Sequence, residues 1–143
     1  MYKKILVPTD GSKFSEKSEE HALFLGEAMG SEIIGLSVVD TKFFNGLPAG
    51  DTIYEINQIL KEESKKNLRR FEEIKKEKNS DVKLRTIAIE GSPADAILEV
   101  AEKEGVDLIV IGSSGKTGLQ KFLMGSVAEK VVKLAKSNVL IVH

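Results

Sequence analysis

Residues 112–126 read GSSGKTGLQKFLMGS, and this glycine-rich stretch decides the fold. It follows residues 106–111, a short apolar run typical of a buried strand. After it, apolar residues recur at helical spacing as far as Leu134. A glycine-rich turn between a strand and a helix lets backbone N–H groups approach an anion closely, and the helix N-terminus adds partial positive charge. The stretch therefore predicts a phosphate cradle for a nucleotide.

Length and composition limit the classes of protein to consider. The chain has 143 residues, 41% hydrophobic and 30% charged, with a net charge of −1 and no cysteine. These values predict one globular domain over residues 1–143, without the basic excess that nucleic acids or anionic membranes attract. The lack of cysteine excludes disulfides, thiolate metal sites and thiol nucleophiles. No apolar run approaches the roughly 18 residues of a membrane helix, so we expect a cytoplasmic protein that does not enter a membrane.

Continuous apolar runs alternate with amphipathic segments along the chain. The first run ends at the turn formers PTDGS, where Ser12 is placed to cap a helix that ends at Gly30. A long helix begins at Thr52, which forms a capping-box pattern with Glu55. Helices occupy the intervals between the predicted strands, which are residues 5–7, 33–39, 82–89, 107–111 and 139–142.

This alternation predicts an α/β fold, a single doubly wound, five-stranded parallel sheet with four helices on its two faces. Lys83 and Arg85 alternate with apolar residues, which places the third strand at a sheet edge. With the strand order 3-2-1-4-5, the order reverses between strands 1 and 4, and ligands bind such sheets beyond the strand ends at that point. The turn at residues 8–12 and the loop at residues 112–126 are then expected to face each other across one crevice.

Two familiar phosphate-binding motifs do not fit this chain. The sequence GKT at residues 115–117 resembles the end of a P-loop, but that motif requires a glycine where the chain has Val110. A dinucleotide fingerprint fails as well, because Gly11 stands alone after the first strand. The loop is therefore not predicted to belong to either class.

The spacing that does fit is G-x2-G-x9-G-S, which the chain carries at Gly112, Gly115, Gly125 and Ser126. In this the chain resembles the universal stress protein family, specifically its ATP-binding branch. The resemblance covers the whole chain and includes KKILVPTDGS, SVVD, GSPADAILEVAEKEGVDLIVIGSSG and GSVAEKVV. It implies a Rossmann-like adenine-nucleotide-binding fold with ATP as the ligand. Because the sequence shows no cluster of metal ligands near the loop, we expect any Mg²⁺ or Mn²⁺ to be held mainly through the phosphates.

The resemblance also implies which residues contact the nucleotide. Ser114 stands where relatives often carry Arg or His, and Lys116 is placed to replace part of that charge. The implied triphosphate contacts are Gly112, Gly115, Gly125, Ser126 and Val127. The implied adenosine contacts are Pro8, Thr9, Asp10 and Val38, with Ile111 beside them.

Each of these residues also has a structural interpretation. Ser126 and Glu129 form a capping-box pattern, in which both side chains would serve the helix's own backbone. Gly112 and Gly115 are common turn residues, and Asp10 fits an Asx-turn. Val38 fits an ordinary core position, and Lys116 an ordinary surface lysine. The spacing to Gly125 favours the phosphate interpretation, since two unrelated turns do not require it.

The sequence shows no convergent acid–base pair and no cluster of metal ligands near the loop, so no catalytic residue is predicted. The expected function is a nucleotide-binding switch or stress-response factor, with slow or partner-dependent hydrolysis and an unidentified protein partner. The competing hypothesis is a dimeric interaction protein of the same family that binds no nucleotide. An enzyme of the wider fold is a third and weaker hypothesis. The last strand, from Val139 to Val142, presents an apolar sheet edge and predicts an antiparallel homodimer, which the resemblance also implies.

Overall fold

The structure is a computed structural model that describes residues 1–44, 46, 50–114 and 124–143. Strands and helices alternate along most of the chain, as the apolar pattern predicts. In order the elements are β1 (Lys4–Pro8), α1 (Lys13–Met29), β2 (Glu32–Asp40), the 3-10 helix η1 (Thr41–Phe44), α2 (Asp51–Glu77), β3 (Leu84–Gly91), α3 (Pro93–Lys103), β4 (Leu108–Gly112), α4 (Ser126–Leu134) and β5 (Asn138–Val142).

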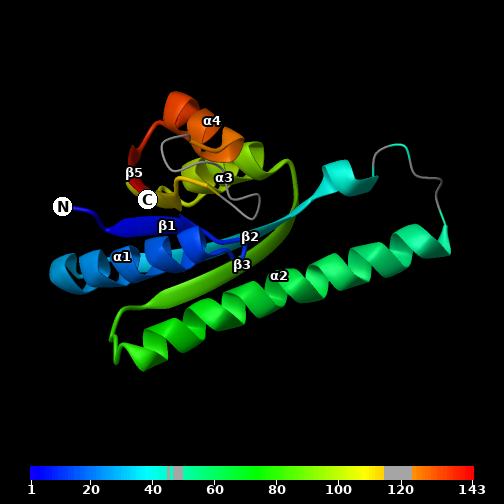
Figure 1. The fold of residues 1–143 in the computed structure, drawn as a ribbon. Coiled ribbons are helices and arrows are strands. Elements are labelled where there is room, and N and C mark those ends of the chain that lie inside the picture. Colours follow the sequence, from blue (N-terminus) through cyan, green and yellow to red (C-terminus); the bar gives the residue numbers. More distant parts are fainter. Residues whose placement is uncertain (45, 47–49, 115–123) are drawn as a thin grey trace.

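The five strands form one parallel sheet in the order β3-β2-β1-β4-β5, which confirms the predicted fold class and strand order. Helices α1 and α2 cover one face of the sheet, and α3 and α4 cover the other (Figure 1). Strand β3 lies at one edge, as its alternating pattern predicts, and β5 lies at the opposite edge. In the part of the chain that the structure describes, no helix is long and apolar enough to cross a membrane.

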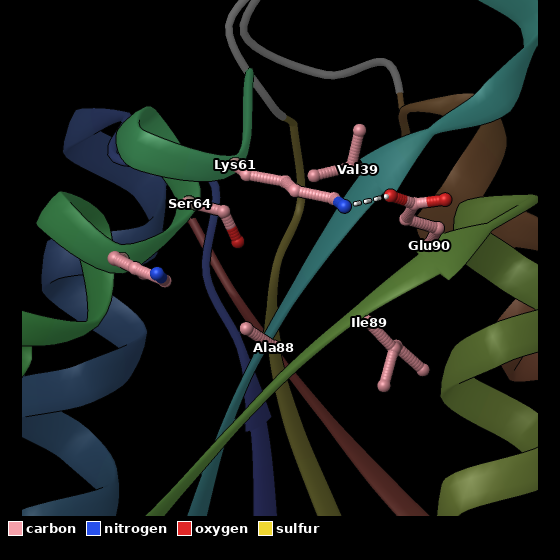
Figure 2. A pocket seen from close by; sticks show the side chains of 7 residues that line it. Val39, Lys61, Ser64, Ala88, Ile89 and Glu90 are labelled. Atoms are coloured by element: carbon pink, nitrogen blue, oxygen red, sulfur yellow. Dashed lines mark ion pairs between the residues drawn. The ribbon is translucent and has the colours of Figure 1, made fainter. Parts of the chain in front are cut away.

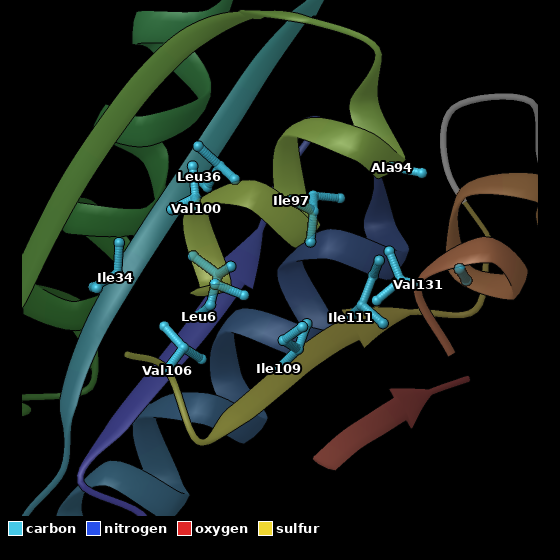
Figure 3. Close-up of a cluster of buried hydrophobic side chains, with 12 residues drawn as sticks. Leu6, Ile34, Leu36, Ala94, Ile97, Val100, Val106, Ile109, Ile111 and Val131 are labelled. Carbon is cyan, nitrogen blue, oxygen red and sulfur yellow. The ribbon is translucent and has the colours of Figure 1, made fainter. Parts of the chain in front are cut away.

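Successive residues of the inner strands pack into two different cores. Ile5 and Val7 of β1 point toward α1 and α2, whereas Leu6 points toward α3 and α4, and all three are 0% exposed. Figure 3 shows the second of these cores, in which Ile97 and Val131 meet the sheet. A strand that is buried on both faces carries apolar residues at every position, which explains the continuous apolar runs.

The helix caps predicted from the sequence are confirmed for α1 but not for α2. The side chain of Ser12 accepts a hydrogen bond from the backbone N–H of Ser15, so the predicted cap of α1 is confirmed. Gly30 ends the same helix in the left-handed conformation, with a φ of 67°. The capping box at Thr52 is wrong, because α2 begins one residue earlier and its N-cap is Gly50, with no side-chain cap.

Helix α2 contacts the sheet along only part of its 27 residues. Its buried residues are Ser64, Leu68, Phe71 and Ile74, all in the carboxyl-terminal half. The amino-terminal half extends past the sheet (Figure 1), and there Tyr54 is 65% exposed. The core therefore holds α2 from Ser64 onward.

We expect Phe71→Ala to lower the free energy of unfolding by about 3–5 kcal/mol, because Phe71 is 0% exposed and its loss leaves a cavity against β2. The matched control is Phe24→Ala, since Phe24 on α1 is 72% exposed and its removal should change stability by about 0.5 kcal/mol or less. Urea denaturation measures both. Equal losses in the two variants would contradict this placement of the core.

Candidate nucleotide site

The glycine-rich stretch leaves the sheet at the carboxyl end of β4, beside β1. The two strands pair in parallel, with Leu6 opposite Ile109, so the connections that follow them leave the sheet at the same edge. The backbone N–H of Gly125 donates to the carbonyl of Ser113 at 2.7 Å. This hydrogen bond joins the two ends of the stretch and holds the start of α4 at the end of β4. Gly115 and Lys116 lie outside the described residues.

The amino terminus of α4 has no side-chain cap. Gly125 is the N-cap, Ser126 is the first helical residue, and the N-cap makes no side-chain hydrogen bond to the first turn. The predicted capping box is therefore wrong, and the carboxylate of Glu129 pairs with Lys133 at 2.8 Å instead. Ser126 is exposed. Since the first N–H groups of a helix have no partner within it, this end of α4 can donate to an anion.

A hollow of about 390 Å³ lies beside this helix end. The amino termini of α3 and α4 both reach it, through Ser92 and Ser126. Two lysines and one carboxylate also line it: Lys42 pairs with the lining residue Asp40 at 3.4 Å, and Lys130 pairs at 2.7 Å with Asp95, which lies outside the lining. Other lining residues are Thr41, Pro93, Ala94 and Val127. Sequence reasoning missed the part that α3 and residues 40–42 play here, because only the fold brings them to α4.

The turn after β1 uses many of its polar groups within the protein. Asp10 Oδ1 accepts hydrogen bonds from the backbone N–H of Ser12 at 2.9 Å and from the hydroxyl of Ser15 at 2.7 Å. The Asx-turn interpretation of Asp10 is therefore correct, and the carboxylate is held in one orientation. Thr9 donates its N–H to the carbonyl of Leu36 at 2.8 Å and its hydroxyl to Glu19 at 2.6 Å. Because both hydrogen-bond donors of Thr9 are used within the protein, a ligand would contact the oxygen atoms or the methyl group of Thr9.

The remaining candidates lie at strand ends. Pro8 ends β1 and is half-buried. Val38 is half-buried on β2 and packs against the core, and Ile111 is 6% exposed on β4. Gly112 is packed against α1, since an added Cβ would lie 2.8 Å from Phe14 Cβ. Of the candidates in the described residues, Ser126 and Val127 line the hollow, and the others, including Val38 and Gly125, do not.

Sequence reasoning also missed Glu19, a buried carboxyl group on α1. Glu19 is 1% exposed, and its Oε2 has no hydrogen-bond partner among the residues that the structure describes. Burial raises its pKa from 4.5 to about 7, and the hydrogen bond from Thr9 opposes that rise. Nearby Glu16 and Asp10 raise the pKa further, and Arg70 lowers it. Nothing in the local sequence distinguishes Glu19 from its exposed neighbour Glu20, because the burial comes from tertiary packing.

The raised pKa of Glu19 makes stability depend on pH. Since the folded protein holds this proton more tightly than the unfolded chain, the stabilisation is complete below about pH 4.5 and is lost as the pH rises through about 7. We expect Glu19 to lower the free energy of unfolding by up to about 3 kcal/mol over this window. Urea denaturation from about pH 5 to about pH 8 measures the change.

Glu19→Gln should remove this part of the pH dependence and stabilise the protein at the upper end of the range. Glu20→Gln is the matched control, because Glu20 is exposed and pairs with Lys78 at 3.6 Å. Its pH profile should follow that of the unchanged protein. If Glu19→Gln shows the same slope as Glu20→Gln, Glu19 is charged in the folded state and the assigned pKa is wrong.

Comparison with solved structures shows the same fold in other proteins. The chain superposes on the structure of MJ0577 from Methanocaldococcus jannaschii with a TM-score of 0.81 and 36% identity, covering 99% of this chain and 96% of that one. It also matches a universal stress protein solved in complex with cAMP, with a TM-score of 0.70 and 28% identity, over 99% of this chain and 97% of that one.

Sequence comparison leads to the same group of proteins. The chain is 44% identical to the universal stress protein MJ0531 of Methanocaldococcus jannaschii over 142 residues, which cover 99% of this chain and 82% of that protein. The model of the universal stress protein family matches residues 1–143. The chain therefore belongs to the universal stress protein family.

Proposed function

We propose that this protein binds ATP in a two-part site at the carboxyl edge of its sheet. The phosphate part consists of Gly112, Gly115, Gly125, Ser126 and Val127, with Lys116 nearby. The adenosine part consists of Pro8, Thr9, Asp10, Val38 and Ile111. The observation that carries the proposal is the uncapped start of α4, where the Ser126 hydroxyl and the first backbone N–H groups border a hollow and serve no side-chain cap.

The helix dipoles at this hollow favour a phosphate ligand. The positive ends of α3 and α4 meet at one hollow, and a negative group placed there interacts favourably with both helix dipoles. A family member solved with cAMP provides precedent for an adenine nucleotide within this fold. Between the two hypotheses for this family, the uncapped helix favours nucleotide binding over a dimeric protein that binds none.

A divalent cation would accompany the nucleotide. No group of three or more His, Cys, Asp or Glu side chains in the described part of the chain is placed to hold a metal. We therefore propose that Mg²⁺ or Mn²⁺ binds chiefly through phosphate oxygens and water. Asp10, the carboxylate in the proposed adenosine part, is held by its own turn.

We propose that the bound nucleotide acts as a switch and is hydrolysed slowly or only with a protein partner. Rapid hydrolysis needs a residue that positions water and charges that stabilise the transferring phosphoryl group. The described residues at the start of α4 supply backbone donors and one hydroxyl, which bind phosphate without activating water. The cytoplasm, where ATP is abundant, is the compartment in which such a switch would act.

Ser126→Ala tests the nucleotide site. We expect saturating Mg-ATP to raise the melting temperature of the unchanged protein by roughly 5–10 °C, and Ser126→Ala to weaken ATP binding about tenfold through loss of a hydrogen bond to a charged group. Thermal shift and calorimetric titration measure these effects. Without nucleotide the variant should keep its melting temperature, because Ser126 caps no helix.

Ser12→Ala is the contrasting variant, since Ser12 does cap a helix and its loss should cost about 1 kcal/mol without any ligand. A melting temperature that ATP leaves unchanged would favour the hypothesis of a protein that binds no nucleotide. Phosphate release by the unchanged protein with Mg-ATP should remain near the uncatalysed background. Sustained turnover well above it would exclude the slow switch.

We also propose a homodimer joined through β5. This strand is a sheet edge, and Val139, Leu140 and Ile141 are only half-buried in the single chain. Because an open apolar edge pairs readily with another strand, two copies related by a two-fold axis would cover each other's edge. Sedimentation equilibrium at micromolar concentration should give about twice the chain mass of 15.7 kDa. A mass equal to one chain would contradict this interface.

A further inference from the structure

A second cavity lies on the opposite face of the sheet, away from the start of α4. Its volume is about 410 Å³, and it opens between α2 and the carboxyl ends of β2 and β3. Figure 2 shows α2 on one side of this cavity and the two strands on the other. This size is at the lower end of the range for small-molecule sites, which suits a compact ligand. Residues that line it include Val39, Lys61, Ser64, Lys65, Ala88 and Glu90.

Ser64 gives the cavity a polar group that the protein does not use. Ser64 is 4% exposed, and its hydroxyl is buried without a hydrogen-bond partner among the described residues. In Figure 2 this hydroxyl points from α2 into the space in front of the strands. A buried hydroxyl without a partner is energetically unfavourable, so a ligand atom that bonds to it would remove that cost.

The mouth of the cavity carries a net positive charge. Lys61 Nζ lies 3.2 Å from Glu90 Oε1. Lys65, which lines the same cavity, has its Nζ 3.8 Å from Glu62 Oε1. The lining therefore carries two lysines and one carboxylate, and Glu62 pairs with Lys65 from outside the lining. Both side chains of the Lys61–Glu90 pair are more than 40% exposed, and pairs of this kind contribute little to stability. A ligand anion can thus approach Lys61 and Lys65 at little cost.

From these observations we infer that the cavity binds a small, mainly apolar monocarboxylate, about one ring in size, with a hydrogen-bonding atom at the end remote from the carboxylate. Its body lies against Val39 and Ala88, its carboxylate meets Lys61 and Lys65, and its remote polar atom bonds to Ser64. The residues that line this cavity include none of those proposed for the nucleotide site, so the two inferences can be tested separately.

Four probes separate the contributions of the carboxylate and the hydroxyl group to binding. They are 4-hydroxybenzoate, benzoate without the hydroxyl, phenol without the carboxylate, and the uncharged 4-hydroxybenzamide. We expect 4-hydroxybenzoate to bind with a Kd on the order of 1 mM or lower and the other three more weakly. Titrations followed by ¹H–¹⁵N spectra should shift the amides of Ser64, Ala88 and Glu90. Saturating Mg-ATP should leave these shifts in place.

Ser64→Ala should weaken 4-hydroxybenzoate about fivefold and leave benzoate unchanged, because only the first probe bonds to the hydroxyl. Lys61→Gln and Lys65→Gln should weaken both carboxylates and leave phenol unchanged, and Lys66→Gln is the matched control because Lys66 is exposed on α2 and does not line the cavity. Ala88→Leu fills the cavity from the sheet side and should abolish binding of all four probes.

Three results would overturn the inference. The first is the lack of any shift at Ser64, Ala88 and Glu90 with millimolar probe, which means that the cavity holds only water. The second is displacement of the probes by ATP, which places them in the nucleotide site. The third is an equal effect of Ser64→Ala on 4-hydroxybenzoate and benzoate.

Discussion

The structure depends on the burial of its central strands on both faces. Ile5, Leu6 and Val7 of β1 are completely buried, as are Ile109 and Val110 of β4. A strand with no exposed face has to lie inside the sheet and between two layers of helices, and parallel strands require a crossover between each pair. The connections that follow β1 and β4 then leave the sheet at one edge. The place of the candidate site is thus a consequence of core packing.

The sheet could be predicted from sequence because apolar runs report burial directly. The caps of α2 and α4 could not be predicted from sequence. The capping-box pattern at Thr52 and Ser126 has the same spacing as any pair of residues on adjacent helical turns. At Ser126 the acidic partner, Glu129, instead pairs with Lys133 one turn further along α4. Glu19 and the cavity at Ser64 could not be predicted either. Both arise where segments distant in the sequence meet, and each residue resembles its exposed neighbours in local context.

The structure also changes how the glycine spacing should be interpreted. Gly112 leaves no space for a Cβ, because Phe14 and its backbone lie within 3.0 Å of that position. Close packing of α1 on the end of β4 is therefore a sufficient reason for this glycine, with or without a phosphate nearby. Gly125 has a different role, since it starts α4 and bonds back to Ser113. The nucleotide proposal consequently draws more from the helix end than from the number of glycines.

The uneven support of α2 has a consequence for motion. Residues 51–63 include no fully buried side chain, whereas Ser64 and the residues after it anchor the helix to the sheet. Opening of the first turns therefore breaks backbone hydrogen bonds and exposes little new apolar surface, while opening of the last turns disrupts the core around Phe71. Amide protons along this one helix should accordingly exchange with solvent at rates that fall from its amino end toward its carboxyl end. The cavity at Ser64 lies at the boundary between the two regimes.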